Sequence, residues 1–156
     1  MLVRIMGREE LTEMVKEKFA PKVAVISITD TDRPDVEFVN VPQYLLQLKF
    51  DDVSEEIYED ILGRKPCVRE MKKISERLHM ISDEQAKRIA AFLVPIYNEI
   101  DILICQCEYG QSRSAGVAAA VMEFYSRSGI TIFAATGYYP NKLVFKKVLT
   151  QLKRYG

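Results

Sequence analysis

Apolar and polar positions follow two alternating patterns along the chain, and these patterns predict strands interleaved with helices. Short runs rich in Val, Ile and Leu at residues 2–6, 22–29 and 101–106 predict strands, and 22–29 has the composition of one buried on both faces. Residues 8–19 and 82–100 instead place apolar side chains at helical spacing. This order predicts an α/β fold with a mostly parallel central sheet and helices on both of its faces.

The second of these helices carries a start signal and a stop signal. Ser82 and Gln85 have the spacing of a capping box, and Pro95 is expected to bend or end the helix. Small residues at 114–126 predict a helix that packs closely on the sheet. From about Asn141 the pattern predicts a final amphipathic helix whose lysines face solvent.

Two stretches in the first half are less regular. Residues 38–41 and 44–50 predict one or two strands, which end at the acidic pair Asp51 and Asp52. The charged, weakly periodic segment 53–80 predicts helical pieces and loop inserted into the body of the fold. The acidic pair is therefore expected at a strand end, where ligands bind in parallel α/β sheets.

Composition narrows the class of protein. A length of 156 residues favours one domain, spanning 1–156, and 48% hydrophobic residues supply enough apolar material for a core. Because 22 Lys and Arg balance 22 Asp and Glu, no overall field attracts a polyanion. Neither nucleic acid nor a membrane is an expected partner.

Features that are rare or missing in the sequence bear on the expected location of the protein and on its expected metal content. No run of residues has the length and apolarity of a membrane span or a signal peptide, so the chain is expected to start at Met1 and to be cytoplasmic. Three cysteines, Cys67, Cys105 and Cys107, are too few for a disulfide framework. With one histidine, His79, a Cys/His metal cluster is not expected, and neither is a cofactor.

The segment 107–114, CEYGQSRS, lies between a predicted strand and a predicted helix. A loop that enters a helix N-terminus turns several backbone N–H groups toward one point, which suits a tetrahedral oxyanion. Arg113 adds a planar fork for two phosphate oxygens, and Gly110 permits an unusual backbone conformation. The predicted phosphate-binding residues are Glu108, Tyr109, Gly110, Gln111, Ser112 and Arg113.

The cysteine that opens this segment is the predicted nucleophile. The positive cradle that binds phosphate also favours the thiolate form of Cys107, which suits a cysteinyl-phosphate intermediate. Ser114 is placed to donate a hydrogen bond to that thiolate. The leaving group needs a proton, and Asp51 or Asp52 is its expected source.

The Cys-x5-Arg-Ser pattern resembles the signature loop of the cysteine-dependent protein tyrosine and dual-specificity phosphatases. The resemblance extends over most of the chain and is densest at 101–122. It implies the fold of that family, phosphomonoester hydrolysis, Cys107 as nucleophile, Arg113 as phosphate clamp and Ser114 as the loop hydroxyl. The segment KFDD resembles the one that supplies the family's general acid, which favours Asp52 with Asp51 as the alternate.

Two departures from the family pattern carry expectations of their own. Many members have histidine before the nucleophile, where this chain has Gln106, so reduced activity or an upward-shifted pH profile is expected. The insert 53–80 lengthens the spacing between acid and cysteine, and it is either a substrate lid or a displacement of the acid.

The expected partner is a phosphorylated protein, with phosphotyrosine favoured near Tyr109, or a small phosphomonoester. The carboxylate of Glu108 argues against strongly anionic inositol phosphates. Two other functions stay open: a catalytically weak domain that binds phosphorylated partners, and redox or sulfur-transfer chemistry at Cys107.

Overall fold

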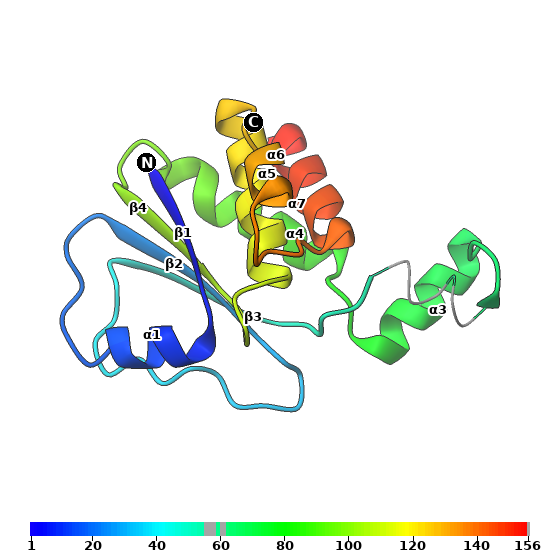
Figure 1. Cartoon of the computed structure of the whole chain (residues 1–156), viewed down its shortest axis with the longest axis horizontal. Helices are drawn as coiled ribbons and strands as arrows, with labels where there is room; N and C mark the ends of the chain where they lie inside the picture. The colour runs from blue at the N-terminus through cyan, green and yellow to red at the C-terminus, as the bar shows by residue number, and fades with distance from the viewer. Residues whose placement is uncertain (55–58, 60–61, 156) are drawn as a thin grey trace.

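The computed structural model describes residues 1–54, 59 and 62–155, and its centre is a sheet of four parallel strands (Figure 1). Their order across the sheet is β1, β4, β2, β3, and every neighbouring pair is parallel. The bounds are Leu2–Met6 for β1, Val23–Thr29 for β2, Tyr44–Lys49 for β3 and Ile102–Gln106 for β4. The mostly parallel sheet predicted from the sequence is confirmed.

The register brings four strand ends to one edge of the sheet. Gln106 at the end of β4 pairs with Met6 on one side and with Ser27 on the other. Thr29, which ends β2, pairs with Lys49, which ends β3. The segments that follow these strands therefore begin beside one another, and ligands bind at this edge in folds of this kind.

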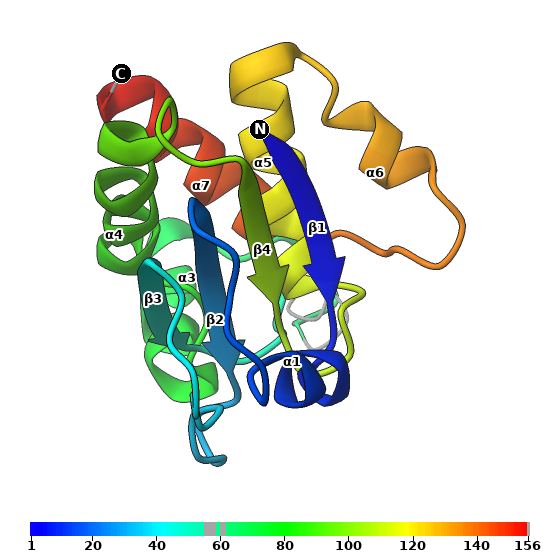
Figure 2. The same cartoon turned by 90° about the vertical axis from the view of Figure 1, so that its left-hand side faces the viewer.

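Helices cover both faces of the sheet, as predicted (Figure 2). One face carries α4 (Asp83–Leu93), α5 (Arg113–Ser126) and α7 (Lys142–Tyr155), whose apolar side chains form one core with the sheet. On the other face, α1 (Arg8–Met14) packs Leu11 against β2 and β4. In the described part of the chain, no helix has the length and apolarity that a membrane span requires.

Several helix ends differ from the prediction. The first helix stops at Met14 rather than Phe19, because the backbone N–H groups of Lys16 and Glu17 bond three residues back instead of four. The helix from Ser82 has the expected capping box and ends at Leu93, and Pro95 lies in the short 3-10 helix η1 (Val94–Ile96) that follows. The five-residue α6 (Ile130–Ala134) was not predicted.

Of the one or two strands predicted at 38–41 and 44–50, the second forms as β3, and 38–41 is a loop. Val39 and Val41 are 71% and 64% exposed, whereas Phe38 is partly buried against the core on the α1 side of the sheet. Asn40 instead donates its backbone and side-chain N–H groups to the Val15 carbonyl at the end of α1, at 3.1 and 2.9 Å. A loop tied to a helix end thus replaces the expected strand.

The insert 53–80 contains the expected helical piece, α3 (Val68–Leu78), which extends away from the sheet in Figure 1. Residues 55–58 and 60–61 of this insert lie outside the described residues. His79 ends α3 in a left-handed conformation with φ of 50°, and its carbonyl accepts from the Asp51 backbone N–H at 2.7 Å. The insert is therefore fastened directly to the acidic pair.

The contact between α5 and α7 depends on Gly116. A Cβ atom there would lie 2.8 Å from the Asn141 carbonyl oxygen and 3.1 Å from the Val144 Cβ. Gly116→Ala is therefore expected to lower the free energy of unfolding by about 1–3 kcal/mol, although alanine favours helices. Urea denaturation measures this, with Lys146→Ala on the exposed face of α7 as the control. A more stable Gly116→Ala protein would contradict the close packing.

Candidate active site

The loop from Cys107 to Ser112 joins β4 to α5 and lies against the end of β1. Gly110 has φ of +68°, and a Cβ atom on it would approach the Gly7 nitrogen to 2.6 Å. The Arg8 backbone N–H donates to the Glu108 carbonyl at 3.0 Å. Only glycine allows this backbone conformation at such close range, so the loop bends as a phosphate-binding loop requires.

Cys107 is 2% exposed, and its Sγ lies 3.0 Å from Ser114 Oγ. Ser114 is the second residue of α5 and is fully buried. The first turn of this helix therefore lies close to the sulfur, where its positive end favours a negative charge. The hydroxyl donates when the sulfur is a thiolate, because a thiolate can only accept.

Arg113 is 4% exposed and is held from two sides. Its Nη1 donates to the Phe50 carbonyl at 2.9 Å and lies 2.6 Å from Asp30 Oδ1. Its Nε is buried and has no partner among the described residues. An unpaired buried donor is costly, so a bound anion is the natural acceptor for it.

Asp30 was missed in the sequence. It follows β2, as Asp51 follows β3, so the strand-end argument applied to it equally. Its carboxylate fixes the Arg113 guanidinium by a charge-assisted hydrogen bond.

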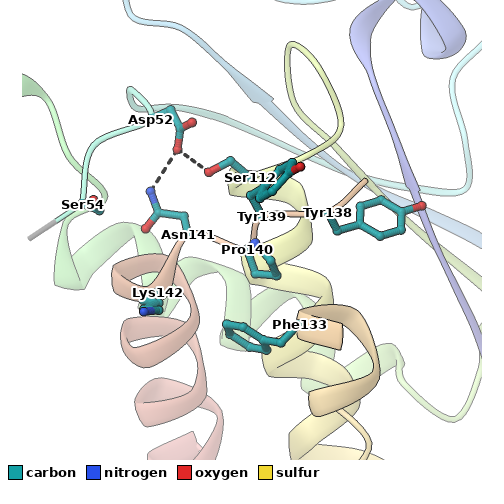
Figure 3. A pocket seen from close by; sticks show the side chains of 9 residues that line it. All are labelled: Asp52, Ser54, Ser112, Phe133, Tyr138, Tyr139, Pro140, Asn141 and Lys142. Atoms are coloured by element: carbon teal, nitrogen blue, oxygen red, sulfur yellow. Dashed lines mark hydrogen bonds between the residues drawn. The ribbon is translucent and has the colours of Figure 1, made fainter. Parts of the chain in front are cut away.

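The carboxylates of Asp51 and Asp52 contact different neighbours. Asp52 Oδ1 accepts from the Ser112 hydroxyl at 2.7 Å and from Asn141 Nδ2 at 3.0 Å (Figure 3). Asp51 instead accepts from the backbone N–H and the hydroxyl of Thr31. The structure therefore brings Asp52 to the loop and leaves Asp51 in a turn contact.

Asn141 links the loop, the acid and the last helix, and it was not singled out in the sequence. Its Nδ2 also donates to the Val53 carbonyl at 3.1 Å, and its Oδ1 accepts from the Val144 N–H at 3.0 Å. Its own backbone N–H donates to the Ser112 carbonyl at 3.0 Å. Asparagine before a helix is a cap signal, which was the available hint.

A cavity of about 420 Å³ lies beside Asp52 and Ser112 (Figure 3). The segment 133–142 supplies most of its wall. Its lining residues are Asp52, Ser54, Ser112, Phe133, Tyr138, Tyr139, Pro140, Asn141 and Lys142. Asp52 and Ser112 therefore border a partly aromatic space.

Comparison with solved structures places this arrangement in a known fold. The chain matches the crystal structure of Tk-PTP in the active form with a TM-score of 0.52 and 16% identity, and that of PTPMT1 in complex with PI(5)P with 0.55 and 11%. Each match covers 99% of this chain and 92% of the other. The chain has the protein tyrosine phosphatase fold. No family model and no curated protein matches the sequence.

In this phosphatase fold the side chain of Glu108 is held by an ion pair, and that of Tyr109 lies in solvent. Glu108 is paired with Arg33, with 2.5 Å between Oε1 and Nη1, and Tyr109 is 81% exposed. Gln111 contributes its carbonyl, which accepts from the Tyr139 N–H at 2.8 Å. Because Arg33 balances the Glu108 carboxylate, the sequence argument that Glu108 repels polyanions loses its basis.

The other two cysteines of the chain differ in exposure to solvent. Cys67 is exposed at the N-terminus of α3, and Cys105 is fully buried on β4. Burial raises the pKa of the Cys105 thiol, and the neighbouring Cys107 raises it further. Cys105 therefore stays protonated. Among the described residues, no three His, Cys, Asp or Glu are grouped as metal ligands.

The raised pKa of Cys105 predicts a stability slope in alkali. Below the unfolded pKa of about 8.5 the buried thiol costs nothing, and above it deprotonation favours the unfolded chain by up to about 1.4 kcal/mol per pH unit. The stability advantage of wild type over Cys105→Ala should therefore shrink between pH 8 and 10. Urea denaturation in reducing buffer measures it, with Cys67→Ala as the exposed-thiol control. A pH-independent advantage would contradict the burial argument.

Proposed function

We propose that the protein hydrolyses phosphomonoesters through a phosphorylated Cys107. The observation that carries this is the unpaired, buried Nε of Arg113 at the start of α5, in the same loop as a sulfur 3.0 Å from the Ser114 hydroxyl. Together with the helix N-terminus, these groups form an anion site that has a nucleophile within it.

In the first step the Cys107 sulfur forms a bond to phosphorus and the bond from phosphorus to the leaving oxygen breaks. Asp52 gives its proton to that oxygen, which takes the electron pair. In the second step a water oxygen attacks phosphorus, Asp52 takes a proton from this water, and the sulfur leaves as a thiolate that Ser114 stabilises. Arg113 binds phosphate oxygens in both steps, and Asp30 and the Phe50 carbonyl keep its guanidinium oriented.

The substrate class we propose is aryl phosphate, with phosphotyrosine in a protein as the natural form. The proton donor marks the side on which the leaving group lies, and the cavity on that side is lined by Phe133, Tyr138 and Tyr139. Since Arg33 pairs with Glu108, phosphoinositides belong in the substrate panel. The proposed thiolate needs a reducing location, for which the cytoplasm is our proposal.

One observation favours a second function, the capture of phosphorylated partners without turnover. Asp52 Oδ1 accepts hydrogen bonds from the Ser112 hydroxyl and from Asn141 Nδ2, so the proposed acid is engaged with the loop and with the segment before α7. A carboxyl group that stays in these contacts binds next to a phosphate without protonating a leaving group, and the protein is then a binding module.

The deciding experiment is hydrolysis of phenyl phosphate and p-nitrophenyl phosphate between pH 5 and 8, without metal and in reducing buffer. Cys107→Ser should abolish both activities. Asp52→Asn should lower kcat for phenyl phosphate by about 10²- to 10⁴-fold, and less for p-nitrophenyl phosphate, whose leaving group needs less protonation. Asp51→Asn is the matched control and should change kcat little.

The opposite results are equally informative. A wild type that binds tungstate but turns over neither ester is a binding module, and the enzyme proposal is then wrong. If Asp51→Asn loses the activity and Asp52→Asn keeps it, the two aspartates exchange roles.

The contact between Asn141 and Asp52 generates a further prediction. Asn141→Asp keeps the oxygen that caps α7 but loses the amide donor that fixes Asp52. We expect kcat for phenyl phosphate to fall at least about tenfold, the size of one hydrogen bond, and the melting temperature to fall as well, because the new carboxylate oxygen faces two acceptors, the Asp52 carboxylate and the Val53 carbonyl.

Asn98→Asp, at an exposed position, adds the same charge elsewhere and is the control. Equal losses with phenyl phosphate and p-nitrophenyl phosphate would assign Asn141 a purely structural role.

A further inference from the structure

We propose that Gln106, oriented by Ser27, is a positioning residue that holds the Cys107 carbonyl outside the anion loop and so keeps the thiolate and a bound phosphate free of its negative end. The inference deepens the proposed function and rests on it. It concerns the position at which this chain has glutamine where many proteins that it resembles have histidine.

The two side chains form a closed, buried pair. Gln106 is the last residue of β4 and is fully buried, and Ser27, its register partner on β2, is 1% exposed. Gln106 Nε2 donates to the Cys107 carbonyl at 2.9 Å, and Gln106 Oε1 accepts a short hydrogen bond from the Ser27 hydroxyl.

Ser27 decides which way the amide is turned. If the amide were flipped, its oxygen would face the Cys107 carbonyl oxygen, and two acceptors would be buried against each other. The Ser27 hydroxyl supplies the donor that Oε1 needs in the observed orientation. Each polar side-chain atom of the pair therefore has a partner in this orientation.

The other carbonyl groups around the loop explain why this matters. The carbonyl oxygens of Glu108, Gln111 and Ser112 accept from backbone N–H groups. The donors are Arg8, Tyr139 and Asn141, in that order. The Cys107 carbonyl, next to the sulfur, is bound by a side chain instead. Without Gln106, this carbonyl is free to rotate toward the anion and repel it.

An amide also differs from histidine in its charge. Histidine gains a proton near neutral pH, whereas the amide of Gln106 has no titration there. The positioning is therefore the same throughout the working range of the thiolate. This argues against the expectation from the sequence that the missing histidine by itself shifts the pH profile of activity upward.

The test measures two properties that do not require turnover. Iodoacetate alkylation of Cys107, followed by peptide mass spectrometry in a Cys67→Ser background, gives the pH midpoint at which the thiolate forms. Tungstate binding measured by calorimetry gives the affinity of the anion loop. The variants are Gln106→Leu and Ser27→Ala, and Cys105→Ala is the control for altered packing on the same strand.

Gln106→Leu should raise the alkylation midpoint by about 0.5–1 pH unit and weaken tungstate binding about three- to tenfold, as expected for one lost hydrogen bond. Ser27→Ala should shift both in the same direction by less. Gln106→His should restore tungstate affinity, because its ring N–H can donate to the same carbonyl, and should add a titration near pH 6–7.

Wild-type midpoint and wild-type tungstate affinity in a folded Gln106→Leu protein would overturn the proposal. If that variant does not fold, Ser27→Ala decides by the same two measurements. An inactive wild type that shows these shifts would refute the enzyme proposal alone. An active wild type without them would refute the positioning role alone.

Discussion

A backbone loop binds an anion only if its N–H groups point inward, and its carbonyl groups must then be held on the outside. Four carbonyls around this loop have such partners, those of Cys107, Glu108, Gln111 and Ser112. The partners come from β4, the start of α1 and the segment before α7. The site is therefore a product of the whole fold, because elements distant in sequence supply the outer contacts.

Strand order makes these contacts possible. With β4 between β1 and β2, the loop after β4 has the start of α1 on one side and Ser27 and Asp30 on the other. The Asp52 segment follows β3, one strand further away, and reaches the loop through Ser112 and Asn141. These contacts with the loop are polar. The apolar cores on the two faces of the sheet hold in place the strands and helices that make them.

The sequence predicted the residues that belong to local patterns. Cys107, Arg113 and Ser114 occupy a strand–loop–helix pattern that is readable without knowing any neighbour. Asp30, Ser27 and Asn141 were missed because their importance depends on which strand lies beside β4, and hydrophobic periodicity carries no strand order.

The run 38–41 shows the converse case. Its apolar residues left a second strand open, yet Val39 and Val41 are exposed, because a pattern records side-chain type and not the presence of a neighbouring strand. Both sources of error, judgement by residue type and an unknown neighbouring strand, apply to Gln106. It was read as the loss of a histidine, and its partner on β2 became visible only in the folded chain.

The fastening of Asp52 and Ser112 to Asn141 has a consequence for biosynthesis. The ribosome makes the chain from its N-terminus, so β4 and the Cys107–Ser112 loop leave the exit tunnel before Tyr139, Asn141 and α7. Until that later segment docks, Asp52 lacks the Asn141 amide, and the Gln111 and Ser112 carbonyls lack the backbone donors that hold them outside the loop. On the proposed function, neither phosphate binding nor turnover is therefore complete in a nascent chain before α7 docks.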